Sequence, residues 1–214
     1  MQIKRFAKQI LLRFGLWYPL DAVRRIPDTI GWLGAGCTGC APHPIKRMVI
    51  ASYLKHYAID LFVETGTYLG ETVSYVANKG VRCVSIELSP ELYRAACARL
   101  ESYTNVKLVC GDSAQRLPET LSDINEPTLF WLDGHYSSGI TASAETHTPI
   151  SAELRAILRH AIKRHVILID DAHCFDGTNN YPHIDELLHV VREDGSYSAE
   201  ISLDIVRLIP LVMP

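Results

Sequence analysis

The stretch His165–Phe175, HVILIDDAHCF, places four branched apolar residues directly before two adjacent aspartates, Asp170 and Asp171. A short apolar run of this kind is typical of a strand that is buried on both faces of a sheet. Two carboxylates so close together repel each other and raise each other's pKa unless a positive charge lies between them. We therefore expect a cation at the end of this strand.

Similar apolar runs occur elsewhere in the chain and alternate with helix-like segments. The expected strands are Ile59–Thr65, Val81–Glu87, Val106–Gly111, Pro127–Asp133, His165–Asp170, Ser196–Leu203 and Asp204–Pro210. The expected helices are Gly70–Lys79, Ser89–Ser102, Ala114–Leu121, Ser151–Arg164 and Ile184–Glu193. Such alternation predicts an α/β fold, a doubly wound, Rossmann-like, seven-stranded and mainly parallel sheet covered on both faces, in which the last two strands pair with each other.

The first 44 residues differ from the rest and are expected to form an N-terminal helical extension and a linker (1–44) ahead of one domain (45–214). The first 26 positions contain six basic residues and one acid, Asp21, and apolar residues recur there at helical spacing. The basic residues are Lys4, Arg5, Lys8, Arg13, Arg24 and Arg25. This amphipathic helix either lies on an anionic membrane face or packs against its own domain or a partner subunit in a homo-oligomer. A linker is expected over Gly31–Pro44, which is rich in Gly and Pro.

Composition excludes several classes of protein. The chain has 214 residues, of which 48% are hydrophobic and 21% are charged, and a net charge of −3, so we expect one globular domain and no nucleic-acid partner. Its six cysteines do not form a disulfide framework and no cleavable signal is evident, which predicts a cytoplasmic protein, at the inner face of the membrane if the basic helix binds lipid. The CTGC segment, with Cys37 and Cys40, predicts a loop with two buried thiols rather than a zinc site.

Five consecutive strands of the expected sheet end in a carboxylate. These acids are Glu64, Glu87, Asp112, Asp133 and the pair Asp170–Asp171. Because open parallel sheets bind ligands outside the carboxyl ends of their strands, we expect a site at this edge.

The segment ETGTYLGET, Glu64–Thr72, is a glycine-containing turn between the first strand and its helix. Glycine lets the backbone approach a ligand, but Gly66 and Gly70 flank Tyr68, so the G-x-G-x-x-G dinucleotide pattern is not met. Glu87 ends the second strand and is placed to accept hydrogen bonds from ribose hydroxyls. Asp112 on the third strand either accepts from an exocyclic amine or caps the following helix.

These motifs together resemble those of class I S-adenosylmethionine-dependent methyltransferases, over about Ile45 to Pro214. The resemblance is closest to the macrocin O-methyltransferase-like branch of metal-dependent sugar O-methyltransferases, which carries a VETGTYxG-like motif, as in VETGTYLG at Val63–Gly70. Tyr68 departs from the generic class pattern and agrees with this branch. The resemblance implies that the turn holds the methionine part of S-adenosylmethionine, with Glu87 at the ribose and Asp112 near the adenine. The full set of implied cofactor residues is Glu64, Thr65, Gly66, Thr67, Tyr68, Gly70, Thr72, Glu87, Leu88, Asp112, Ser113 and Asp133.

The cation expected beside Asp170 and Asp171 is interpreted as a divalent metal. With Asp133 they supply three hard oxygen ligands, which suit Mg²⁺ or a similar ion, and the resemblance implies the same three positions. Since side chains alternate faces along a strand, both members of the pair can bind one ion only if the chain turns there. The alternative is that one aspartate caps the next turn and the other is solvated.

A proton acceptor is expected close to these aspartates. His135, two residues after Asp133, is the predicted catalytic base, and His173, two residues after Asp171, is its rival. The long polar connection Gly134–Pro149 and the segment Ala172–Pro182 suit a hydroxylated acceptor, either a small molecule or a glycan.

Three functions follow from this pattern. The first is a metal-dependent O-methyltransferase that acts on a hydroxyl group, and the expected acceptor is a sugar in a glycoconjugate or natural product. The second is a nicotinamide-dependent oxidoreductase, because Glu87 would serve its ribose equally well. The third is a non-catalytic protein that keeps the cofactor fold and binds another ligand.

Overall fold

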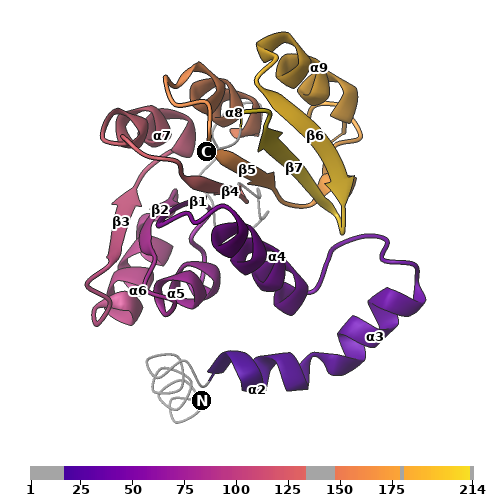
Figure 1. The fold of residues 1–214 in the computed structure, drawn as a ribbon. Helices are drawn as coiled ribbons and strands as arrows, with labels where there is room; N and C mark the ends of the chain where they lie inside the picture. The colour runs from indigo at the N-terminus through magenta and orange to yellow at the C-terminus, as the bar shows by residue number, and fades with distance from the viewer. Residues whose placement is uncertain (1–16, 134–147, 179–180, 213–214) are drawn as a thin grey trace.

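The computed structural model describes residues 17–133, 148–178 and 181–212 (Figure 1). They form one seven-stranded sheet in the order β3-β2-β1-β4-β5-β7-β6. The strands are β1 (Leu61–Thr65), β2 (Arg82–Glu87), β3 (Val106–Cys110), β4 (Leu129–Leu132), β5 (Val166–Ile169), β6 (Tyr197–Ser202) and β7 (Ile205–Pro210). The first five are parallel, and β7 is antiparallel to both β5 and β6. The predicted fold class is confirmed, and the strand order reverses between β1 and β4.

Helices cover both faces of the sheet (Figure 1). The helices α4 (His43–His56), α5 (Glu71–Ala77) and α6 (Pro90–Leu100) lie on one face. The helices α7 (Ser113–Ser122), α8 (Ile150–Arg159) and α9 (Ile184–Asp194) lie on the other, and a short 3-10 helix, η1 (Ala172–Cys174), follows β5. The sheet therefore has the doubly wound arrangement that the alternating pattern predicts.

The central strands divide their side chains between two apolar cores. In β4, Leu129 and Trp131 pack with the α4–α5 layer, while Phe130 and Leu132 pack with the α7–α9 layer. β5 divides in the same way, and all four of its residues are fully buried. Burial on both sides explains why these strands are continuously apolar.

Local signals place most helix boundaries, and one boundary differs from expectation. Ser89 caps α6 by accepting a hydrogen bond from the Leu92 backbone N–H, with Pro90 as the first helical residue. The helix expected over Ser151–Arg164 ends instead at Arg159, because His160 is extended, with ψ 146°. The His160 Nδ1 lies 2.8 Å from the Nε2 of His165, only five residues further along the chain, so the chain turns directly after the helix.

The N-terminal segment is more helical than predicted. It contains α2 (Trp17–Arg24) and α3 (Ile26–Gly34), so the linker expected over Gly31–Pro44 is non-helical only between α3 and α4. Asp21 of α2 is buried and accepts a hydrogen bond of 2.6 Å from Arg47 of α4, which attaches α2 to the domain. The helix α4 is not among the expected elements, and its first turn carries a lysine, Lys46, and no acid.

The two helices α2 and α3 expose a row of apolar side chains. These are Leu20, Val23, Ile26, Ile30 and Leu33. The basic helix whose membrane and oligomer interpretations are given above falls mostly on residues 1–16, outside the described residues, and those interpretations stay predictions. No helix in the described part of the chain is long and apolar enough to cross a membrane.

The cysteine loop differs from expectation. All six cysteines are free thiols, but Cys40 is exposed and Cys37 is only half-buried, so the prediction of two buried thiols is wrong. Three of the four residues Gly36–Gly39 have positive φ, which turns this loop along the surface rather than into the core.

Candidate active site

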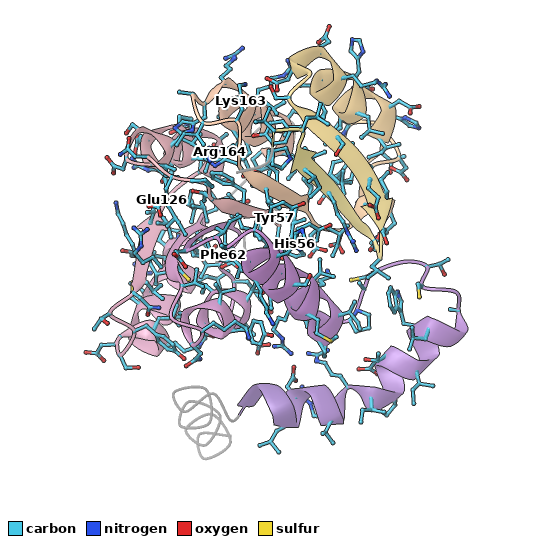
Figure 2. All side chains as sticks on the ribbon, viewed as in Figure 1. His56, Tyr57, Phe62, Glu126, Lys163 and Arg164 are labelled. Carbon is cyan, nitrogen blue, oxygen red and sulfur yellow. The ribbon has the colours of Figure 1, made fainter. Side chains whose placement is uncertain are left out.

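The carboxyl ends of β1 to β5 share one edge of the sheet, because these strands are all parallel. Each of them is followed or ended by one of the predicted acids. The opposite ends of these strands carry charges of both signs: Lys163 and Arg164 precede β5, whereas Glu126 precedes β4 and Asp60 precedes β1 (Figure 2). The acids are therefore gathered where α/β sheets bind ligands.

The turn between β1 and α5 is bent so that its backbone folds onto the end of β2. Gly66 and Gly70 have φ of 85° and 66°, which glycine adopts without strain. The Gly66 N–H donates a hydrogen bond of 2.9 Å to the Ile86 carbonyl. Tyr68 is left-handed, with φ 45°, and 59% exposed, so its ring stands at the rim of the turn. Thr72 lies in the first turn of α5 and is half-buried.

Glu87 closes this turn. Its carboxylate accepts hydrogen bonds from the backbone N–H groups of Tyr68, at 2.7 Å, and Ser89, at 2.9 Å. Each carboxylate oxygen has a second lone pair, so Glu87 is still able to accept from a hydroxyl group. Leu88 beside it is 36% exposed and offers an apolar surface next to the acid.

Glu64 lies beneath the turn and is almost completely buried. It accepts a hydrogen bond of 2.6 Å from the Ser85 hydroxyl, whose oxygen lies 2.6 Å from the Thr67 hydroxyl. Burial raises the pKa of Glu64 to about 8, the Glu87 charge adds to the rise, and the Ser85 hydrogen bond opposes it. At neutral pH, Glu64 is mainly a neutral acid.

Asp112 follows β3 and caps α7. Its side chain accepts a hydrogen bond of 2.9 Å from the Ala114 backbone N–H, so the capping alternative is confirmed. Asp112 and Ser113 are half-buried at the same edge as Glu87. Gly111 before them has φ 137°, a conformation that L side chains rarely adopt.

The other half of the edge gathers three aspartates. Asp133, after β4, donates its backbone N–H to the Thr65 carbonyl at 3.2 Å, and the Asp170 N–H donates to the Leu132 carbonyl at 3.0 Å. One carboxylate oxygen from each of Asp133, Asp170 and Asp171 lies within 4.8 Å of the others. Asp171 is left-handed, with φ 49°, so the chain turns where two neighbouring carboxylates must reach the same side.

A lysine that the sequence patterns did not single out lies between the paired acids. The Lys46 Nζ, from the first turn of α4, is 2.6 Å from Asp170 Oδ2 and 3.0 Å from Asp171 Oδ1. All three side chains are buried. Burial raises the pKa of Asp170, with the Asp171 charge adding to the rise and Lys46 opposing it. The two carboxylates raise the pKa of Lys46 despite its burial, so Lys46 is a permanent cation.

The three aspartates also fit a divalent metal. Their donor set is all carboxylate oxygen, at a spacing that one ion can bridge. Lys46 uses one oxygen of each paired acid, and Asp170 Oδ1 accepts from the Asp171 N–H. Three carboxylates and one ammonium carry a net charge of about −2 when all four are ionised, which equals in size the charge of one divalent ion.

The two predicted bases have different outcomes. His135 lies outside the described residues. His173 is 44% exposed, and its Nδ1 is 2.7 Å from Asp204 Oδ2. Asp204 is held near the paired acids, since one oxygen of it, one of Asp171 and the Cys40 sulfur lie within 4.8 Å of one another. If Nδ1–H donates to Asp204, Nε2 is the acceptor nitrogen of the ring, and it lies 3.5 Å from the Cys174 sulfur.

Glu153 is a second residue that sequence reasoning missed. It lies on α8, is fully buried, and neither of its carboxylate oxygens has a hydrogen-bond partner among the described residues. Burial raises its pKa to about 7. The nearby side chains of Ser113 and Thr65, two of the predicted cofactor residues, act to lower this pKa. Its signal in the sequence is its position on the apolar face that Ile150, Leu154 and Ile157 form at helical spacing.

Comparison with known proteins identifies the fold. No family model matches the chain, and no curated protein matches it in sequence. Among solved structures, the O-methyltransferase from Bacillus cereus in complex with SAH is similar with a TM-score of 0.59 and 16% identity, over 83% of this chain and 86% of that chain.

Two further solved structures resemble the chain to a comparable degree. The SAH-bound methyltransferase from Podospora anserina gives a TM-score of 0.57 and 14% identity, over 80% of each chain. The O-methyltransferase of tomaymycin synthesis from Streptomyces achromogenes, solved with SAM, gives 0.53 and 15%, over 79% of this chain and 82% of that chain. At these identities the likeness shows a shared fold, the Rossmann-like methyltransferase fold.

Proposed function

We propose that the protein is an S-adenosylmethionine-dependent O-methyltransferase that works with a divalent cation. The observation that carries the proposal is the division of one sheet edge into two sites. The β1–β3 half offers a bent turn with Glu87 and Asp112, and the β4–β5 half offers three carboxylates within 4.8 Å of one another. The methyltransferase fold supports this assignment, and it is seen with SAH or SAM in the similar solved structures.

The residues of the first half have the chemistry to bind the cofactor. Glu87 would accept from the ribose hydroxyls, and Leu88 and Tyr68 would supply apolar contact at the rim. Asp112 lies where an exocyclic amine could donate to it. Glu64, mainly neutral at pH 7, stabilises the floor of the turn without adding a charge beneath the methionine part.

The residues of the second half would place the acceptor. Asp133, Asp170 and Asp171 would hold a divalent ion, which when bound lowers the pKa of a hydroxyl group. S-adenosylmethionine would supply the methyl group from its sulfonium sulfur, and a histidine of the chain would take the proton from the acceptor hydroxyl. His135 is the proposed base, and His173, oriented by Asp204, is the alternative.

A sugar or related polyol is the proposed acceptor. Segments next to the acids carry hydroxyl, amide and imidazole groups rather than stacked aromatic rings. In the described segment after β5, the rings of Phe175 and Tyr181 meet edge-to-face at 5.3 Å and are not stacked. Polar side chains of this kind suit a substrate with several hydroxyl groups.

The test uses the melting temperature of the whole chain with two ligands in separate samples. S-adenosylhomocysteine should raise it and NADH should leave it unchanged, because only a ligand that binds the folded state stabilises the protein. The opposite pattern would replace the proposal with a nicotinamide-dependent oxidoreductase. Stabilisation by S-adenosylhomocysteine without methyl transfer from labelled S-adenosylmethionine to any polyol or glycan acceptor would indicate a non-catalytic binding protein.

A further inference from the structure

Lys46 makes three contacts that use its whole donor capacity. Its ammonium lies 2.6 Å from Asp170 Oδ2, 3.0 Å from Asp171 Oδ1 and 3.5 Å from the Cys40 sulfur. An ammonium has three N–H donors, so each contact is matched by one of them. The side chain is 8% exposed, and the two carboxylates are 2% and 6% exposed.

The place of Lys46 in the fold is unfavourable by local rules. A cation in the first turn of a helix is opposed by the helix dipole, and the first turn of α4 contains no acid to balance it. Burying a lysine is also unfavourable unless it is paired. Among the described residues, the negative charges that offset both terms are those of the two aspartates, 124 and 125 residues further along the chain.

We propose that Lys46 is a tethered cation that holds Asp170 and Asp171 in position before a divalent ion binds, and that it weakens the binding of that ion. The ammonium already neutralises one of the two charges of the pair and occupies one oxygen of each carboxylate. A divalent ion bound by Asp133 and the pair would lie close to this ammonium and be repelled by it. This inference rests on the proposed function, because it assigns Lys46 a role at the proposed metal site.

The role has two consequences that oppose each other. Without Lys46 the metal-free protein is destabilised, because two buried carboxylates lose their counter-charge. The same change strengthens metal binding, because the repulsion is gone. A lysine that served packing alone would produce the first effect without the second. Lys46 is thus a positioning residue with a measurable signature in the metal affinity.

The experiment compares the wild-type chain with Lys46→Met, without cofactor or acceptor. Isothermal titration with Mn²⁺ should show binding at least about tenfold tighter in the variant. In EDTA the melting temperature of the variant should fall by about 5 °C or more, and saturating Mn²⁺ should recover most of the loss. Lys163→Met is the matched control, because Lys163 also pairs with an aspartate, at 2.8 Å, but at the opposite sheet edge (Figure 2).

A second variant covers the case in which Lys46→Met does not fold. Lys46→Met combined with Asp170→Asn removes one positive and one negative charge together, so it should be more stable in EDTA than Lys46→Met alone. No gain from the second substitution would overturn the inference.

The outcomes separate this inference from the proposed function. Equal Mn²⁺ affinity in wild type and Lys46→Met, or a stability loss that Mn²⁺ does not recover, overturns the role of Lys46 and leaves the metal site standing. Binding in neither protein overturns the cation of the proposed function and this inference with it. Tighter binding in the variant supports the inference, whatever the cofactor proves to be.

Discussion

The two halves of the sheet edge hold their acids by different means. In the β1–β3 half, neutral groups donate to the carboxylates: backbone N–H groups to Glu87 and Asp112, and the Ser85 hydroxyl to Glu64. In the β4–β5 half, the buried ammonium of Lys46 does so for Asp170 and Asp171. Neutral donors suffice where the acids are apart, and a cation is needed where they are adjacent. We therefore expect that removing a positive charge changes the properties of the acids in the β4–β5 half and not those in the β1–β3 half.

The largest effect is expected from Asp170→Asn. It removes a charge from the proposed metal site, and methyl transfer should fall at least about a thousandfold, because electrostatic stabilisation of a reacting group has about that size. The affinity for S-adenosylhomocysteine, measured by isothermal titration, should change little. Unchanged turnover in the variant, or full wild-type activity in excess chelator, would remove the cation from the mechanism.

The next largest effect is expected from Arg47→Met. Arg47 follows Lys46 in α4, but its buried ion pair with Asp21, at 2.6 Å, lies in the attachment of α2. Its loss should weaken that attachment by about 3 kcal/mol, as for other buried pairs that lose one partner. Limited trypsin cleavage at Arg24 and Arg25 should become faster.

The control for Arg47→Met is Arg24→Met. Arg24 also contacts Asp21, at 3.3 Å, but its side chain is 66% exposed. An exposed pair contributes little, so cleavage at Arg25 should stay close to the wild-type rate. Equal acceleration in both variants would show that burial does not distinguish the two pairs.

A smaller effect is expected from Gly111→Ala, next to Asp112. The φ of 137° at Gly111 is strained for alanine, and the new Cβ would lie 2.8 Å from Arg116 Nε, a side chain that can move. The free energy of unfolding should fall by about 1 to 2 kcal/mol. Denaturant unfolding measures this, and an unchanged midpoint would show that the backbone there relaxes.

The smallest destabilisation is expected from Glu64→Gln at pH 5, where both side chains are neutral. The folded pKa of Glu64, about 8, lies above the ordinary 4.5, so the folded state keeps a proton that the unfolded chain has lost. The free energy of unfolding of the wild type therefore falls as pH rises from 4.5 to 8. Glutamine does not titrate, so the variant lacks this part of the pH dependence. Thermal unfolding across this range should show the melting temperature of the variant rising relative to that of the wild type as pH increases. A gain toward low pH would mean that Glu64 is charged in the folded state.

The sheet could be predicted because strands that are buried on both faces are continuously apolar in sequence. An acid at the end of each such strand located the site. The same logic predicted that Asp133, Asp170 and Asp171 would come together, and it required the turn that Asp171 makes. The end of α8 at Arg159 was less predictable, because the helix-like pattern continues past this residue to Arg164. There the contact between His160 and His165 stops a helix that the local pattern would continue.

Lys46 and Glu153 were missed for different reasons. Lys46 lies 124 residues from Asp170, and only the packing of α4 on the sheet brings them together. A lysine in the first turn of a helix with no acid beside it was a weak signal that favoured a functional role. Glu153 had a clearer signal, because an acid on an otherwise apolar helix face predicts a buried carboxylate.

The most direct test of the two-part edge is a crystal structure with S-adenosylhomocysteine and Mn²⁺, in which anomalous scattering locates the metal. We expect the adenosine beside Glu87 and Asp112, and one anomalous peak bridging Asp133, Asp170 and Asp171. Adenosine bound elsewhere, or carboxylates of Asp133 and Asp170 that point apart with no peak between them, would contradict the proposed site.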